Sequence, residues 1–525
     1  MARSENFQLA YEISKPSFTP AQRDAPALVE LIENGVEPVC SHAAAALAVL
    51  GDTGRRAIEA RMSRANLAED AHARLVSAVG RFARRGDSAA RSALIAALQL
   101  PSARVRRAAI GGLGHLCSET DVGEVGDALL ARWDASDVTP HERRALTDAL
   151  GKLGGEQALQ RLRAHHPGGD VELARRRDRA LLIADRSATR GTASEVRVDQ
   201  TPTSPLAVRL HCKSGFANLL VDELRAKGIE ARANRDDAVD ISLMQPWSAL
   251  FASRLWMSGA IRVARPAGPL ASSIVSGIVA QRSFLAAWTH GSIRWRLEVP
   301  RGKQRALVWH VAREVSHRAP ELVNDPTSTT WDIAVEDAAL ELRPRRVADP
   351  RFAYRSAEVP AASHPTVAAA LARLGEARHD DRVWDPFVGS GLELIERAML
   401  GPARSLTGTD LAPTAIAAAR TNLEAAGVSA SLQIGDARAA KGDRDLDLVI
   451  TNPPLGSRVK VNAVELLITA LPIFARRLAS HGRLVWITPA TTKTSPVAEQ
   501  LGFRRRASVP VDLGGMRGHV ERWDT

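Results

Sequence analysis

The chain has few cysteines and no long apolar run. Its 525 residues include three cysteines, Cys40, Cys117 and Cys212, which lie far apart and form no CxxC or Cys/His spacing. This pattern indicates neither a disulfide framework nor a zinc site, and we expect no bound metal. No apolar stretch approaches the ~18 residues of a membrane span, and the N-terminal residues contain no signal-peptide core. We therefore expect a cytoplasmic protein without a membrane partner.

The charge balance is basic. The sequence has 70 Lys and Arg against 59 Asp and Glu, which gives a formal charge of +11 and a pI near 10.2. Such an excess favours an anionic partner such as nucleic acid, although a solvated, arginine-rich surface is an alternative explanation. The length exceeds what one hydrophobic core covers, so we expect several domains.

Residues 27–186 are rich in Ala, Leu and Arg, with apolar residues at helical spacing. VRRAAIGGLGHL and ERRALTDALGKL repeat with an offset of 37 residues, from Gly114 to Gly151, and Gly80 lies another 34 residues upstream. This period is typical of HEAT-like solenoids, in which each helix pair is buried only against its neighbours. We expect a curved surface for a protein partner; a scaffold without a ligand is the alternative.

The middle of the chain changes character twice. Residues 187–205 are rich in Ser, Thr, Arg and Pro and predict a linker. Residues 206–345 mix short alternating strands with amphipathic helices, which predicts an α+β module. Six tryptophans of this module invite a role in base stacking, but at helical and strand spacings we expect them in the core. They are Trp247, Trp256, Trp288, Trp295, Trp309 and Trp331.

Strands and helices alternate through residues 346–525, which predicts a doubly wound sheet with ligands at the carboxyl ends of its strands. VWDPFVGSG reads as a strand that ends at Asp385, followed by a glycine turn at Gly389, Ser390 and Gly391. Such a turn lets the backbone approach a ligand, but it fits a nicotinamide site equally well. Asp410, 25 residues after Asp385, stands where a carboxylate accepts from ribose hydroxyls.

Two further strand ends carry polar groups. Asp436, in QIGDAR, is a candidate acceptor for the adenine amino group, and a helix N-cap is the alternative. Asn452, Pro453 and Pro454 close the strand VITNPP. The Asn452 amide oxygen and the Pro453 carbonyl are two acceptors whose relative orientation the rigid prolines fix. They are suited to hold an amine toward an electrophilic methyl group and to stabilise developing positive charge, without a nucleophile or a metal.

These motifs resemble the class I S-adenosylmethionine-dependent amino-methyltransferases. From about Leu206 to the end, the chain more closely resembles the THUMP-domain RNA guanine-N2 methyltransferases. The residues that carry this resemblance are RFAYR (351–355), DPFVGSGLELIE, GTDL, GDAR and TNPPLGSR. The resemblance covers about three-fifths of the chain. It implies three parts: an N-terminal HEAT-like α-solenoid, a central α+β THUMP/ferredoxin-like module that binds RNA, and a C-terminal α/β Rossmann-like methyltransferase domain.

The resemblance also implies a cofactor, a substrate and their residues. The cofactor is S-adenosyl-L-methionine, and the substrate is the exocyclic N2 of guanosine in structured RNA, either tRNA or rRNA. The implied cofactor-binding residues are Asp385, Phe387, Gly389, Ser390, Gly391, Asp410, Leu411, Asp436 and Ala437. Asn452, Pro453 and Pro454 are the implied catalytic residues, and Leu455 and Arg458 the implied substrate-binding residues.

One position departs from the family pattern. Leu455 stands where the family has a tyrosine or phenylalanine that stacks on the flipped base, and such stacking contributes ~1–3 kcal/mol per base. Two alternatives therefore stay open. The acceptor is adenine N6 or a protein glutamine, or the domain is noncatalytic and the chain is an RNA-binding scaffold. Arg458 either meets a phosphate or is an exposed charge.

Overall fold

A computed structural model describes residues 9–15, 18–64, 66–116, 123–300, 304–336, 338–360, 363–454, 463–512 and 517–525. The chain forms two compact units. The first comprises Met1–Ser194, Gly291–Arg296 and Lys303–Ser328, and the second comprises Glu195–His290, Leu297–Gly302 and Thr329–Thr525. Leu455 and Arg458 lie outside the described residues.

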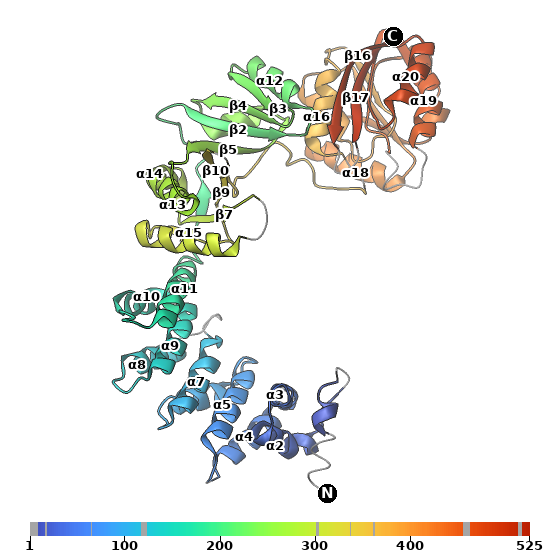
Figure 1. Ribbon diagram of the computed structural model, residues 1–525. Helices are drawn as coiled ribbons and strands as arrows, with labels where there is room; N and C mark the ends of the chain where they lie inside the picture. Colours follow the sequence, from blue (N-terminus) through green and yellow to red (C-terminus); the bar gives the residue numbers. More distant parts are fainter. Residues whose placement is uncertain are drawn as a thin grey trace. The chain divides into compact units, whose positions relative to one another are not determined.

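The first unit is almost entirely helical, as expected for residues 27–186 (Figure 1). After η1 (Gln22–Asp24), its helices are α2 (Ala25–Asn34), α3 (Val39–Val49), α4 (Asp52–Met62), α5 (Glu69–Ala83), α6 (Ser88–Ala97), α7 (Ala103–Gly114), α8 (Gly123–Asp134), α9 (Pro140–Leu153), α10 (Gly155–Ala164) and α11 (Val171–Ala188). One continuous apolar core runs through them. The helical N-terminal region is confirmed, and its assignment to the HEAT class stays a prediction.

The repeated glycines lie where successive helices touch. A Cβ atom on Gly80 of α5 would lie 3.1 Å from the Cα of Gly112 in α7, and one on Gly151 of α9 would lie 2.6 Å from the Cα of Ala180 in α11. Gly114 of α7 is similarly close to α9. The glycine period therefore marks the close contacts along the series α5, α7, α9 and α11.

Helix α11 extends into the stretch predicted as a linker. It ends at Ala188, and strand β1 (Ser194–Val196) follows. Arg186, near its end, donates to the Asn324 side chain at 2.8 Å, in β8 (Leu322–Asn324). Helix α15 (Arg305–Arg318) also packs on α11, and both α15 and β8 belong to the first unit. The first division between the compact units, after Ser194, lies within the predicted linker 187–205, although Gly291–Arg296 and Lys303–Ser328 also belong to the first unit. The predicted domain bounds stay predictions.

The second unit begins with antiparallel strands that run in the order β3-β4-β2-β5-β10-β9. Their bounds are β2 (Leu206–Cys212), β3 (Ala231–Arg235), β4 (Ala238–Leu243), β5 (Trp256–Ala264), β9 (Trp331–Val335) and β10 (Ala339–Pro344). The other elements of this region are α12 (Ala217–Ala226), η3 (Trp247–Ala252), α13 (Leu270–Ala280), α14 (Arg282–Ala287) and β6 (Thr289–Gly291). Strand β7 (Ile293–Glu298) has its first four residues in the first unit and its last two in the second. The α+β character expected for this segment is present.

Five of the six tryptophans of this region are buried, so the core interpretation is confirmed for them. Trp295 and Trp331 are completely inaccessible to solvent. Trp309, on α15, is half-buried under the guanidinium of Arg313, at 5.1 Å from the ring centroid. Base stacking by the five buried indoles would need their surroundings to open, so we do not assign it to them.

The C-terminal part of the second unit is a seven-stranded sheet in the order β13-β12-β11-β14-β15-β17-β16. Its strands are β11 (Arg382–Asp385), β12 (Ser405–Asp410), β13 (Ser431–Ile434), β14 (Leu446–Thr451), β15 (Leu478–Thr488), β16 (Arg504–Asp512) and β17 (Arg517–Asp524). The first five are parallel, and β17 runs antiparallel to β15. The strand order reverses direction at β11 and β14, where open α/β sheets bind their ligands.

Helices cover both faces of this sheet (Figure 1). They are α16 (Pro365–Leu374), α17 (Leu392–Met399), α18 (Pro413–Ala425), η4 (Ala437–Ala439), α19 (Ala463–Arg477) and α20 (Thr491–Gln500). Helix α19 ends at Arg477, and β15 begins directly at Leu478. The doubly wound, Rossmann-like class is confirmed.

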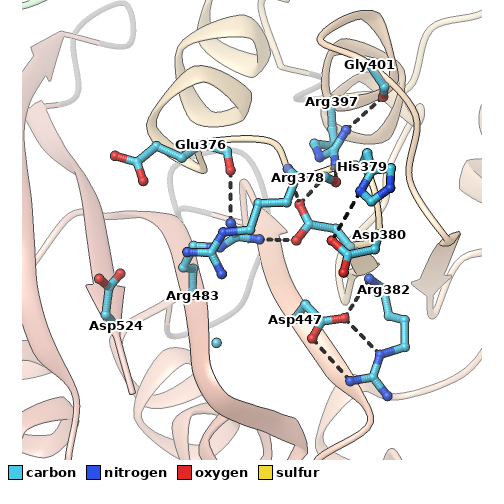
Figure 2. Close-up of polar contacts among 12 residues, drawn as sticks. Glu376, Arg378, His379, Asp380, Arg382, Arg397, Gly401, Asp447, Arg483 and Asp524 are labelled. Carbon is cyan, nitrogen blue, oxygen red and sulfur yellow. Dashed lines mark hydrogen bonds and ion pairs between the residues drawn. The ribbon is translucent and has the colours of Figure 1, made fainter.

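Buried ion pairs hold the amino-terminal edge of this sheet (Figure 2). Arg397 of α17 and Arg483 of β15 both donate to the carboxylate of Asp381, and all three side chains are at most 1% exposed. Arg382 pairs with Asp447 across β11 and β14 at 2.8 Å. These charges lie at the opposite ends of the strands from Asp385, Asp410 and Thr451, so they fix the sheet and leave the carboxyl ends to the candidate site.

Within the described ranges, no helix is long and apolar enough to cross a membrane. Those ranges also hold no group of three or more His, Cys, Asp or Glu side chains arranged to ligate a metal ion.

Candidate active site

Asp385 lies at the centre of the carboxyl edge, at the end of β11. Its side chain is fully buried. Its Oδ1 accepts from the Thr451 hydroxyl at 2.7 Å and from the Phe387 N–H at 3.1 Å. No described residue donates to Oδ2. Burial and the nearby carboxylate of Glu393 raise the pKa of Asp385 well above its ordinary value.

The glycine turn adopts the backbone conformation that its sequence predicts. Gly389 and Gly391 have φ of +49° and +84°, which L side chains rarely adopt. The Gly389 N–H donates to Asp410 Oδ2 at 3.0 Å, and the Ala412 N–H donates to Oδ1 at 2.9 Å. The carboxylate of Asp410 therefore joins the turn after β11 to the end of β12. Ser390 is buried, and its carbonyl accepts from Asn422 Nδ2 at 2.9 Å.

Two apolar side chains stand exposed at the ends of β12 and β13. Leu411 is 63% exposed and Ile434 is 61% exposed. Asp410, the neighbour of Leu411, pairs with Ile434 across the two strands. Large exposed apolar side chains beside a ribose-type carboxylate form suitable walls for a planar base. Leu411 was expected from the sequence; Ile434 was missed, although its place at the end of a strand was visible in QIGDAR.

Asp436 is a helix N-cap, which was the alternative interpretation. Its Oδ1 accepts from the Arg438 N–H at 2.9 Å at the start of η4, and Arg438 also forms an ion pair with it at 2.7 Å. The hydrogen bond from Arg438 lowers the pKa of Asp436. Recognition of adenine by this carboxylate stays a prediction. It would require the adenine amino group to donate to an oxygen that already accepts from Arg438. Ala437 packs into the core beside the sheet.

Asn452 and Pro453 directly follow Thr451, the last residue of β14. The Thr451 hydroxyl donates to Asp385, which connects this strand end to that of β11. Asn452 donates from Nδ2 to the Ser363 hydroxyl at 2.8 Å. Its Oδ1 is shielded from solvent and has no donor among the described residues. Pro453 is buried and Pro454 is half-buried. The Asn452 amide oxygen, which accepts no hydrogen bond from the described residues, therefore lies at the end of β14, where the strand order reverses.

Several polar residues around Asn452 were missed by sequence reasoning. Ser363, just before α16, donates to Oε1 of Glu393 on α17. Burial raises the pKa of Glu393 to about 7, against the opposing hydrogen bond from Ser363. One turn later on α17, Glu396 accepts from the Tyr354 hydroxyl. It also accepts two hydrogen bonds from the Arg254 guanidinium, at 2.5 and 2.8 Å. Glu393 and Glu396 lie within DPFVGSGLELIE and Tyr354 lies within RFAYR, but no role was predicted for these side chains. Ser363 lies outside every motif.

The RFAYR segment joins the two parts of the second unit. Arg351 is buried, lies over the Trp256 ring at 3.7 Å, and donates to the carbonyls of Ser253 and Trp256 at 3.0 Å each. Tyr354 reaches Glu396 of the sheet domain. Through Arg351 and Tyr354, this segment therefore links the antiparallel strands to α17.

Comparison with known proteins assigns the C-terminal region. Residues 353–519 match the family described as "RMKL-like, methyltransferase domain". This match lies within the predicted range 346–525, and the prediction that the cofactor is S-adenosylmethionine is confirmed for this domain.

Two curated relatives are RNA-modifying enzymes by name. A tRNA (guanine(10)-N2)-dimethyltransferase of Methanothermobacter thermautotrophicus is 29% identical over 140 residues, which cover 26% of this chain and 39% of that protein. A tRNA (guanine(6)-N2)-methyltransferase of Thermus thermophilus is 34% identical over 163 residues, covering 30% and 48%. The chain thus matches less than half the length of either relative.

The crystal structure of TrmN from Thermus thermophilus has a similar fold. It aligns with 61% of this chain and 99% of its own, with a TM-score of 0.50 at 21% identity. At this identity the likeness concerns the fold alone. By sequence, the C-terminal region is similar to the RMKL-like methyltransferase domain family and to the two tRNA guanine-N2 methyltransferases. The THUMP-like and HEAT-like assignments stay predictions.

Proposed function

We propose that the protein transfers a methyl group from S-adenosylmethionine to the exocyclic N2 of guanosine in tRNA or rRNA. The observation that carries this proposal is Asn452 Oδ1, a buried acceptor without a donor among the described residues, beside the rigid Pro453. A buried acceptor of this kind is costly unless a ligand supplies a donor. The names of the two relatives support guanine N2 as that donor.

The cofactor fits the residues at the carboxyl edge. Asp385 Oδ2 is buried without a described donor, the backbone at Gly389 and Gly391 carries no Cβ, and Leu411 and Ile434 are exposed. We assign Asp385 and the glycine turn to the methionine and ribose end. Asp410 is assigned to the ribose, and the space beside Leu411 to the adenine. When bound, S-adenosylmethionine supplies an electrophilic methyl group.

The chain's own residues act by positioning and by electrostatics. Asn452 Oδ1 and the Pro453 carbonyl accept the two hydrogens of the target amine, which directs the nitrogen lone pair out of the base plane. Charge that develops on this nitrogen is stabilised by the same two oxygens in a site shielded from water. The target base leaves its stack to reach them. Leu455 and Arg458 are proposed to contact the base and its phosphate.

The other parts are proposed to serve the RNA. The central module would dock structured RNA, consistent with the formal charge of +11. The solenoid would present a surface for a protein partner.

The test is transfer of labelled methyl from S-adenosylmethionine to total RNA by the full chain, followed by identification of the labelled nucleoside. We expect N2-methylguanosine. We also expect Asn452→Ala to reduce the rate by about 10²- to 10³-fold while cofactor affinity is unchanged, because one preorganised polar group is removed. Label in N6-methyladenosine or in protein would show that the acceptor is adenine N6 or a protein side chain and not guanine N2. Binding of the cofactor and RNA without transfer to any RNA would indicate a noncatalytic scaffold.

A further inference from the structure

A chain of three side chains runs behind the candidate catalytic amide. Asn452 Nδ2 donates to Ser363 Oγ at 2.8 Å, and Ser363 in turn contacts Oε1 of Glu393. The three residues come from the end of β14, the approach to α16 and the first turn of α17. Glu393 is 3% exposed. Ser363 lies outside the motifs that carry the resemblance to known enzymes, and Glu393 lies within DPFVGSGLELIE but is not among the predicted binding or catalytic residues.

We infer that Ser363 and Glu393 are positioning residues that fix the rotation of the Asn452 amide so that Oδ1, and not Nδ2, faces the target amine. This inference rests on the proposed function, because it assumes that an amine is the group that Asn452 receives. It goes beyond that function by assigning roles to two residues that do not touch the substrate.

The donor and acceptor inventory gives the chain one direction. An amide nitrogen can only donate, so Ser363 Oγ accepts from Asn452 with a lone pair. The single hydroxyl hydrogen of Ser363 is then left for Glu393, and an ionised carboxylate can only accept it. A rotated amide would present Oδ1 to Ser363 and take that hydrogen. Ser363 would then face the buried carboxylate of Glu393 with lone pairs alone, which is unfavourable in a site of low dielectric.

The protonation state of Glu393 decides how strict this direction is. Glu393 is faced by two carboxyl groups, Asp385 from the end of β11 and Glu396 from its own helix. Burial raises its pKa to about 7. A protonated Glu393 can itself donate to Ser363, which frees the hydroxyl hydrogen for a rotated amide. The ionised form therefore locks the amide, and the protonated form permits both rotations.

The first experiment reads the amide directly and needs no turnover. The full chain is labelled with ¹⁵N-asparagine, and the Asn452 side-chain signal is assigned by its loss in Asn452→Asp. We expect slow exchange of one Nδ2 hydrogen and a chemical shift that titrates near pH 7. Ser363→Ala should remove both features, and Glu393→Gln should remove the titration. An Asn452 signal that exchanges freely, or that is identical in Ser363→Ala, overturns the inference.

The second experiment measures the effect on methyl transfer to total tRNA. We expect Ser363→Ala to lower kcat by about tenfold, the effect of one hydrogen bond, with the Kd for S-adenosylmethionine unchanged by calorimetry. Ser363→Thr, which keeps the hydroxyl, should retain kcat. Ser508→Ala is the matched control, since Ser508 contacts Glu521 at 3.4 Å in the same domain without touching Asn452.

The pH dependence separates positioning from a general loss of stability. Wild-type kcat should rise through pH 7 as Glu393 ionises, and Glu393→Gln should show a flat profile at the low-pH level of the wild type. Equal kcat for the wild type and Ser363→Ala, with methylated RNA formed, would overturn the inference while the proposed function stands. If the Asn452 signals behave as expected but no RNA is methylated, the amide orientation is established and the proposed function is overturned.

Discussion

Replacement of Asp381 by asparagine should weaken the sheet of the methyltransferase domain strongly. Asp381 accepts from Arg397 at 2.9 Å, from Arg483, and from the Arg378 N–H at 2.8 Å. Both guanidinium groups are 0% exposed. An asparagine amide can accept from one arginine, but its NH₂ group then faces the other. Loss of one partner of a buried ion pair costs about 3–5 kcal/mol, because a charge is left buried and unpaired.

The groups around Arg397 and Arg483 compensate only in part for the loss of the Asp381 carboxylate. Burial already lowers the pKa of Arg483, in spite of the opposing attraction of Asp381. The carbonyl of Glu376 accepts from Arg483 at 2.9 Å and that of Gly401 accepts from Arg397 at 3.0 Å, so backbone oxygens soften but do not neutralise the two charges. The expected loss is therefore at the lower end of the range, about 3 kcal/mol.

Hydrogen exchange of the full chain, read by mass spectrometry on peptides from β14 and β15, measures this loss where it occurs. Protection should fall on the order of 100-fold in Asp381→Asn. Asp447→Asn is the matched control at the same edge, because Asp447 and Arg382 are 30% and 35% exposed and such pairs contribute at most about 1 kcal/mol. Equal effects of the two substitutions would refute the reasoning.

Three further outcomes are expected. Asp385→Ala should weaken S-adenosylmethionine binding by about 10- to 100-fold in calorimetry, because a buried hydrogen-bonding group is lost; unchanged affinity would contradict its assignment. Gly151→Ala should destabilise the contact with Ala180 by about 1–3 kcal/mol, since its Cβ would lie 2.6 Å from the Ala180 Cα. At Gly111 an added Cβ would meet no atom within 4 Å, so Gly111→Ala should be neutral or stabilising. Hydrogen exchange in α9 measures the effect of Gly151→Ala, and exchange in α7 that of Gly111→Ala. Because the folded-state pKa of Glu393 is raised from 4.5 to about 7, its contribution to stability is complete below pH 4.5 and lost as pH rises through 7. Glu393→Gln should therefore flatten urea unfolding midpoints over this range; a wild-type slope of opposite sign would contradict the assignment.

The sequence by itself determined the elements of the fold and the strand ends that carry chemistry. Period and capping predict most helices and strands because these signals are local. Asp385, Asp410 and Asn452 were predicted to lie at one edge of the sheet because parallel strands deliver the residues that follow them to the same edge, and their strands are arranged in this way. The glycines at positions 80, 114 and 151 were found as a period. Their reason, close contact between helices, became visible only in the packing.

Only the tertiary structure decided how these groups work together. Ser363, Glu393 and Asn452 are separated by up to 89 residues, and no pattern in the sequence links them. For Asp436 the sequence left open an adenine acceptor and a helix N-cap; its oxygens cap η4 and bind Arg438, and the adenine contact stays a prediction. Hydrogen-bond direction, burial and the raised pKa of Glu393 are properties of groups brought together by folding. A residue's type sets what it can donate or accept, and its neighbours in space decide which of these capacities is left for a ligand.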